Sequence, residues 1–329
     1  MEIGELIDKD FRGVIAVRKR GGNILWQASG FADLANEVPN TVETKFPTAS
    51  AGKIFVAVAI LQLIEQKKLS LDSRLSDLVT FNPEELDPAV TIEQLLTHTS
   101  GVPDYFDESV MKDYSELWRD FPNYKIRTSK DLLPLFIHKP MMYPPGQKFQ
   151  YNNSGYVLLG LILEAFTGVP FDTCLNTSIF QPCGMANTGY FELDRLPAQC
   201  ANAYIYDEAR QAYHTNIFSV DAKGTGAGGA YTTVGDIERF WDSLLGAKLV
   251  SKSTLNTMLS PQVKERCYGY GVWLDEQPTG GFVYHIEGCD PGVSFWSSYD
   301  PEKELNITLV SNFGHDVWRL EAALETLSL

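Results

Sequence analysis

A run of consecutive apolar residues is the feature that most limits what this chain can fold into. From Ile54 to Leu61 every side chain is apolar, and a helix that is apolar on all sides must be packed by neighbours all round. Yet Ser50 and Lys53 stand just before this run, three residues apart and therefore on one helical face. We expect a buried helix, opened by Ser50 and running to about Lys68, that presents a hydroxyl and an amine together.

Composition excludes several classes of protein. The chain has 329 residues, with 42 acidic and 27 basic side chains and a net charge of −15, so the basic face of a nucleic-acid-binding protein is not expected. No apolar run approaches the roughly 20 residues of a membrane span. The first residues lack the pattern of a secretory signal, so we expect a cytoplasmic protein unless a leader was removed. Neither cysteines nor histidines show metal-ligand spacing, and we expect no metal and no cofactor.

Strand patterns lie at both ends of the chain and helix patterns in the middle. Gly13–Gly30 is typical of a β-hairpin, and strand patterns joined by short turns return after residue 203, which favours antiparallel neighbours. A last amphipathic helix is predicted at Asp316–Leu327. We predict an α+β fold: an antiparallel sheet domain from residues 1–70 and 200–329, flanked by helices, with a mostly helical domain inserted at residues 71–199.

The Ser50–Lys53 pair suggests nucleophilic catalysis. A serine is a weak nucleophile unless a neighbouring base takes its proton, and burial in apolar surroundings lowers the pKa of a lysine. The alternative is that Ser50 caps the helix and Lys53 is a surface lysine. The four-residue pattern alone does not decide between the two interpretations.

A second motif supports catalysis. The stretch PPGQKFQYNNSGYVLLG places Tyr151 and Asn153 just before another apolar helix. A nearby lysine ammonium lowers the pKa of a tyrosine, which would bring Tyr151 towards the range of a general base. The asparagine amide can hold both a lysine and a substrate carbonyl.

Four blocks together, PTASAGK, LLTHTSGVPDY, PPGQKFQYNNSGYVLLG and GGAYTTVGD, give the chain a family resemblance. It resembles the serine β-lactamase and penicillin-binding-protein superfamily, on the branch of class C β-lactamases, D,D-peptidases and related esterases. The resemblance implies a β-lactamase/transpeptidase-like fold and an acyl-enzyme mechanism. Ser50 would attack a carbonyl, Lys53 and Tyr151 would shuttle the proton, and Asn153 would hold the substrate. The oxyanion hole would use backbone N–H groups of the nucleophile and of a sheet strand.

The third motif of that family departs from its pattern here. The family has K-T-G or H-x-G on a strand, followed by P-G, whereas this chain has YHIEGCDPGVSF. Counting back from Pro291 puts Ile286, Glu287 and Gly288 in the slot, while starting from His285 requires one extra residue. The two registers turn side chains to opposite faces, and both stay open. The candidate substrate-binding residues are Asn153, His285, Ile286, Glu287, Gly288 and Cys289.

The register determines the expected substrate class. If His285 lies outside the slot, no permanent cation occupies it, and Glu287 adds a negative charge. We then expect an enzyme that disfavours anionic substrates and prefers neutral esters, amides or amine-bearing peptides.

Two further motifs are expected to play no catalytic part. GTGAGG at residues 224–229 satisfies a dinucleotide-binding pattern, but no helix pattern opens directly after it. His98, in HTSG, is expected to have a structural hydrogen-bonding role.

The predicted function is a serine hydrolase that acts through Ser50 on an ester, amide or β-lactam carbonyl. The alternative is a catalytically weak penicillin-binding or sensor-type protein. The expected partner is a small molecule or short peptide, and we expect a monomer. The sequence does not distinguish a β-lactamase from an esterase or a D-peptidase.

Overall fold

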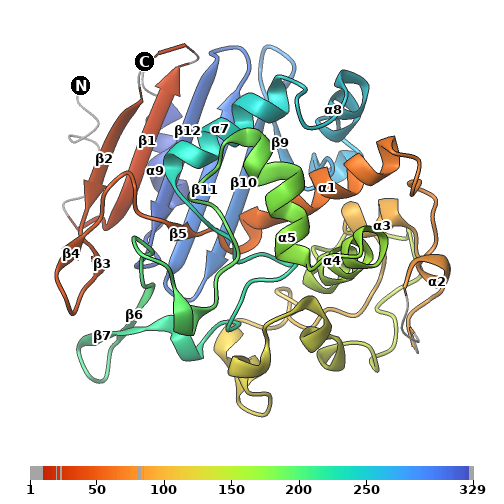
Figure 1. Ribbon diagram of the computed structural model, residues 1–329, viewed down its shortest axis with the longest axis horizontal. Coiled ribbons are helices and arrows are strands. Elements are labelled where there is room, and N and C mark those ends of the chain that lie inside the picture. The colour runs from red at the N-terminus through yellow and green to blue at the C-terminus, as the bar shows by residue number, and fades with distance from the viewer. Residues whose placement is uncertain (1–9, 20, 23, 80–82, 84, 326–329) are drawn as a thin grey trace.

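A six-stranded antiparallel sheet forms the centre of the computed structural model, which describes residues 10–19, 21–22, 24–79, 83 and 85–325 (Figure 1). The strand order is β2-β1-β12-β11-β10-β9. Strands from the beginning and the end of the chain thus lie side by side. The six strands are β1 (Gly13–Lys19), β2 (Leu25–Ser29), β9 (Trp273–Glu276), β10 (Phe282–Asp290), β11 (Val293–Asp300) and β12 (Leu305–Ser311).

The predicted N-terminal hairpin is present, because β1 and β2 pair with each other. Asn23, in its turn, lies outside the described residues, as do residues 1–9, on which the expectation about a leader depended.

Helices cover both faces of the sheet. α9 packs against β11 and β12 on one face and buries a small apolar cluster that includes Ile15, Leu309 and Val317. α1 and α7 lie on the other face, over the main core. Figure 1 shows α7 in front of the sheet and α9 behind it. Because side chains alternate between the faces along a strand, neighbouring residues of β10 point into different layers.

The middle of the chain supplies most of the remaining helices. The helices of the described residues are α1 (Lys53–Glu65), α2 (Leu75–Leu78), α3 (Ile92–Leu96), α4 (Asn153–Thr167), α5 (Phe171–Leu175), α6 (Gln181–Cys183), α7 (Val234–Leu245), α8 (Lys252–Met258) and α9 (Val317–Glu325). α1 contacts α4 and α5, and one apolar core runs through all three. The domain boundaries at residues 70 and 200 stay a prediction.

Short two-stranded ribbons complete the fold. They are β3 (Phe31–Asp33) with β4 (Val38–Pro39), β5 (Phe46–Pro47) with β8 (Tyr231–Thr232), and β6 (Tyr204–Asp207) with β7 (Ala212–Thr215). The β5–β8 pair lies next to the Ser50 turn along the chain and ties two distant segments together.

No single helix of the described residues has the length and apolar composition that a membrane crossing requires. One bent pair, Asn153–Thr167 with Phe171–Cys183, meets that criterion by length and composition only. The cytoplasmic location stays a prediction.

Candidate active site

Ser50 lies in a 3₁₀ turn, Ala49–Gly52, and α1 begins only at Lys53. The prediction that Ser50 opens the α-helix is therefore wrong in detail. A 3₁₀ turn has three residues per turn and aligns side chains at i and i+3, so the Lys53 Nζ lies 2.9 Å from the Ser50 Oγ. The capping positions are Thr48 and Gly52, so Ser50 is not a helix cap.

Lys53 is buried, and its amine donates hydrogen bonds to three acceptors. Its side chain is 2% exposed, and Nζ donates to the Ser50 Oγ, to the Asn153 Oδ1 at 2.8 Å and to the Ala227 carbonyl at 2.5 Å. Burial lowers the pKa of Lys53 to about 8, although the carboxylates of Glu108 and Asp104 oppose the shift. The lowered pKa makes the neutral amine accessible near neutral pH, and a neutral amine can accept the serine proton.

Tyr151 differs from the expectation. Its pKa is raised well above the usual value, because burial of the phenol and the Glu108 charge outweigh its hydrogen bond to Ser50. The Lys53 Nζ lies 4.9 Å from the centre of the Tyr151 ring. At that distance the lysine charge does not reverse the effect of burial on the Tyr151 pKa. The expected lowering of the Tyr151 pKa is wrong. Tyr151 is a protonated phenol beside the serine and is suited to donate a proton.

A buried carboxylate fixes the start of α4. Asp104 accepts hydrogen bonds from the backbone N–H groups of Asn153 and Ser154, each at 3.0 Å. A negative charge at a helix N-terminus is favourable, and this contact holds the Asn153 amide towards Lys53. Sequence reasoning missed Asp104: it lies within the quoted LLTHTSGVPDY block, but a single aspartate has no spacing that marks it.

His98 has the structural role that the sequence suggested. Its Nδ1 accepts from the Asn152 N–H at 3.0 Å, and its Nε2 lies 3.1 Å from the Tyr268 hydroxyl. Burial lowers its pKa well below the usual value, so the ring is neutral.

Gly288 determines the register of the third motif. A Cβ at this position would lie 2.3 Å from the Thr48 carbonyl oxygen and 2.7 Å from the Ser50 backbone nitrogen, so only a glycine lets β10 pass this close to the nucleophile. Ile286 shares this face and is 2% exposed, within the main core. The strand therefore places Ile286, Glu287 and Gly288 in the K-T-G slot.

His285 does not line the cavity at Ser50. Its ring stacks on Trp296 with centroids 4.1 Å apart, and its Nδ1 hydrogen-bonds Asp275. The buried Ile286 side chain does not reach the cavity either. No cation therefore stands in the slot. Glu287 accepts a hydrogen bond from the Trp318 indole.

The glycine-rich segment at residues 224–229 supports the nucleophile turn. The Gly229 N–H donates to the Ala49 carbonyl at 2.9 Å, and a Cβ at Gly228 would lie 2.3 Å from that same oxygen. Ala49 itself has a φ of 45°, a left-handed conformation that is strained for alanine. The glycines thus serve close packing around Ser50 rather than a dinucleotide.

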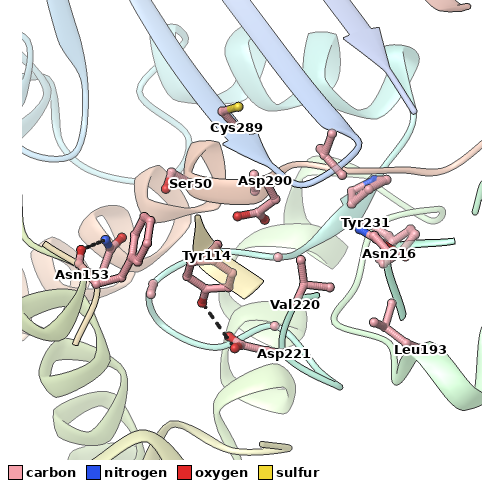
Figure 2. A pocket seen from close by; sticks show the side chains of 18 of the residues that line it. Ser50, Tyr114, Asn153, Leu193, Asn216, Val220, Asp221, Tyr231, Cys289 and Asp290 are labelled. Carbon is pink, nitrogen blue, oxygen red and sulfur yellow. Dashed lines mark hydrogen bonds between the residues drawn. The ribbon is translucent and has the colours of Figure 1, made fainter. Parts of the chain in front are cut away.

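Two adjoining hollows meet at Ser50. Both are bordered by Phe106, Glu108, Tyr114, Cys289 and Asp290. The first also contains Asn153 and extends to Asn216, Asp221 and Tyr231, as Figure 2 shows. The second contains Tyr151, Trp273, Glu287 and Trp318. The structure thus brings Ser50, Lys53, Tyr151, Asn153, Glu287, Gly288 and Cys289 together, and sequence reasoning missed Asp221 and Asp290.

Comparisons with known proteins agree with this geometry. The family model described as Beta-lactamase matches residues 3–327. A crystal structure of a penicillin-binding protein from Bacillus halodurans superposes with a TM-score of 0.94 at 40% identity, covering 98% of this chain and 99% of that one.

Two curated relatives match over less of their length. Penicillin-binding protein 4* of Bacillus subtilis is 28% identical over 86% of this chain, which spans 64% of that relative. Esterase EstB of Burkholderia gladioli is 33% identical over 54% of this chain and 47% of the esterase. The predicted fold class is confirmed, and the chain belongs to the beta-lactamase family.

Proposed function

We propose that Ser50 is the nucleophile and forms an acyl-enzyme with an ester or amide substrate. The observation that carries this proposal is the contact between the buried Lys53 amine and the Ser50 hydroxyl, 2.9 Å apart. A lysine whose pKa is lowered to about 8 is a competent base near neutral pH.

The geometry supports a two-proton relay. Lys53 takes the Ser50 proton as Oγ attacks the carbonyl carbon, and the oxyanion forms beside the Ser50 N–H and the adjoining edge of β10 at Gly288. When the tetrahedral intermediate collapses, the Tyr151 phenol protonates the leaving group and then regains a proton from Lys53. Water then attacks the acyl-enzyme, and the same relay runs in reverse. Tyr151 takes a proton from the water as it passes its own to Lys53, and Lys53 returns a proton to the Ser50 Oγ as the acyl group leaves.

The cavity favours uncharged or cationic substrates over anionic ones. The slot that holds a cation in the family pattern contains the buried Ile286. The acidic residues of the second hollow outnumber the one lysine that the structure describes there, Lys112; they are Glu108, Asp113, Glu287 and Asp290. The similarity to a protein named esterase supports an esterase or amidase. Similarity to penicillin-binding proteins supports a second candidate, a slow acyl-enzyme with little turnover.

The test is covalent labelling followed by intact mass measurement. Wild-type protein, Ser50→Ala and the matched control Ser109→Ala, an exposed serine, are treated separately with a fluorophosphonate and with a penicillin. We expect the fluorophosphonate to label the wild type and the control but not Ser50→Ala. A lasting penicillin adduct without ester turnover would favour the second candidate. No adduct with either reagent would overturn the proposal.

A further inference from the structure

The two hollows hold different halves of a substrate, if Ser50 acts as proposed. Tyr151, the proton donor to the leaving group, lines the second hollow and not the first. The leaving group must therefore depart into the second hollow, and the acyl group must occupy the first. Asn153, whose amide faces the scissile carbonyl in this arrangement, borders that first hollow.

Three carboxylates, Glu108, Asp221 and Asp290, line the acyl hollow. Asp290 extends into it from the end of β10, and Asp221 lies on the side away from β10, as Figure 2 shows. Asp221 accepts one hydrogen bond, from the Tyr114 hydroxyl at 3.2 Å, and Glu108 stands at the rim. Among the described residues, no lysine, arginine or histidine belongs to the lining of this hollow.

Two further polar side chains line the same hollow. Tyr231 is 4% exposed, and among the described residues no hydrogen bond is seen for its hydroxyl. Asn216 is 7% exposed and uses its amide nitrogen on the Pro291 carbonyl at 2.9 Å, which leaves its amide oxygen as an acceptor. The amide oxygen accepts and the tyrosine hydroxyl accepts or donates, so both can bind a ligand that donates hydrogen bonds.

We infer that the acyl hollow recognises a positively charged acyl group, an ammonium-bearing ester or amide whose cation is held between Asp221 and Asp290. An ammonium carries three N–H donors and no acceptor, which matches a hollow of carboxylates and other acceptors. A carboxylate at the same place would lie near Glu108 and would keep Asp290 and Asp221 protonated, so it gains none of the charge attraction that an ammonium gains.

The charge state of the hollow agrees with this assignment. Burial raises the pKa of Asp290 to about 7, with Glu108 adding to the shift, and burial with the nearby Asp290 raises that of Asp221 to about 8. In the empty hollow the raised pKa values favour the protonated acids. A bound cation lowers these pKa values and so favours the ionised form.

Boronic acids give a binding test that does not require turnover, because boron adds reversibly to an activated serine and imitates the tetrahedral intermediate. The probes are alkylboronic acids of three chain lengths, each ending in an ammonium, a methyl or a carboxylate. Affinity is read from how strongly each probe slows fluorophosphonate labelling of Ser50. At one length or more, we expect the ammonium to bind about tenfold or more tightly than the methyl, and the carboxylate to bind worst.

Variants assign the effect to the two acids. Asp221→Asn and Asp290→Asn should each lose about tenfold in affinity for the ammonium probe with little change for the methyl probe. The control Asp120→Asn removes one exposed carboxylate outside both hollows and should keep the wild-type preference. The labelling rate without probe reports whether each variant is folded.

The outcomes separate the two proposals. If Ser50 is labelled but the methyl probe binds as well as the ammonium at every length, the cation site is refuted and the nucleophile stands. Retention of the ammonium preference in both acid variants refutes it equally. If Ser50 is not labelled in the wild type, the proposed function itself fails.

Discussion

At the scale of single residues, the protonation state of Lys53 should control activity. Only the neutral amine can accept the Ser50 proton, so the fraction of competent enzyme rises as the pH passes the Lys53 pKa of about 8. We expect kcat/KM for an uncharged ester to rise with pH between 6.5 and 9, with an apparent pKa near that value.

The matched variants are Lys53→Arg, which stays protonated, and Lys248→Arg on the exposed surface. Lys53→Arg should lose about 10²- to 10⁴-fold in kcat/KM, the usual contribution of a general base, while Lys248→Arg keeps the wild-type profile. A flat profile over this pH range, or an active Lys53→Arg, would show that another group takes the proton.

Single residues also show what the sequence could and could not predict. Ser50, Lys53, Tyr151 and Asn153 were identifiable because each belongs to a short motif with fixed spacing. The Tyr151 pKa was predicted in the wrong direction because burial and the Glu108 charge come from segments that the motif does not contain. Asp221 had no local pattern and meets the site only through folding.

At the scale of elements, the close approach of β10 to the nucleophile turn should be essential. In Gly288→Ala the new Cβ would meet the Thr48 oxygen and the Ser50 nitrogen, so the strand must move away from the position of the oxyanion. Loss of one oxyanion donor typically lowers kcat by about 10²- to 10³-fold, and we expect a loss of that size with the fold retained.

Gly235→Ala in α7 provides the control, because a Cβ there would make only ordinary contact, with Arg239. It should keep wild-type kcat. Both variants are followed by steady-state kinetics with circular dichroism as a check of folding. Wild-type kcat in Gly288→Ala would mean that β10 takes no part in stabilising the oxyanion.

Elements were predictable where local pattern and tertiary packing agree. Alternating apolar residues and short turns indicated the strands that became β10, β11 and β12 and their antiparallel order. The register of the third motif was not predictable, since a one-residue slip keeps the strand pattern, and only the packing of Gly288 on the Ser50 turn decides it. The segment at residues 71–199 was predicted to be mostly helical, but within it Ser129–Leu135, which contains Pro134, forms a 3₁₀ helix and not an α-helix.

At the scale of the whole molecule, the acidic hollow should reduce stability at neutral pH. In the folded state the pKa values of Asp290 and Asp221 are about 7 and about 8, against an ordinary value of 3.8. Between those values the folded protein binds more protons than the unfolded chain, so the free energy of unfolding falls as the pH rises. The slope is about 1.4 kcal/mol per pH unit for each proton of difference.

The window from pH 6.5 to 8 contains this effect together with that of Glu238, whose pKa burial raises to about 7 and which acts in the same direction. Below it, the unfolded chain gains a proton at His98, whose folded pKa is lowered by burial, and above it the lowered pKa of Lys53 makes stability rise with pH. We therefore expect the Tm of the wild type to fall between pH 6.5 and 8, by about 2–4 °C for each kcal/mol lost.

Asp221→Asn should reveal the origin of the slope, because an amide in this position has no charge to desolvate. Its Tm should decline less than that of the wild type over the window and exceed it at pH 8, whereas Asp120→Asn should run parallel to the wild type. The same carboxylate carries both effects, so the variant that gains stability at pH 8 should also lose the ammonium preference. Parallel curves of Tm against pH for Asp221→Asn and the wild type would show that Asp221 is ionised in the folded protein at no cost in stability. The pKa of Asp221 would then not be raised.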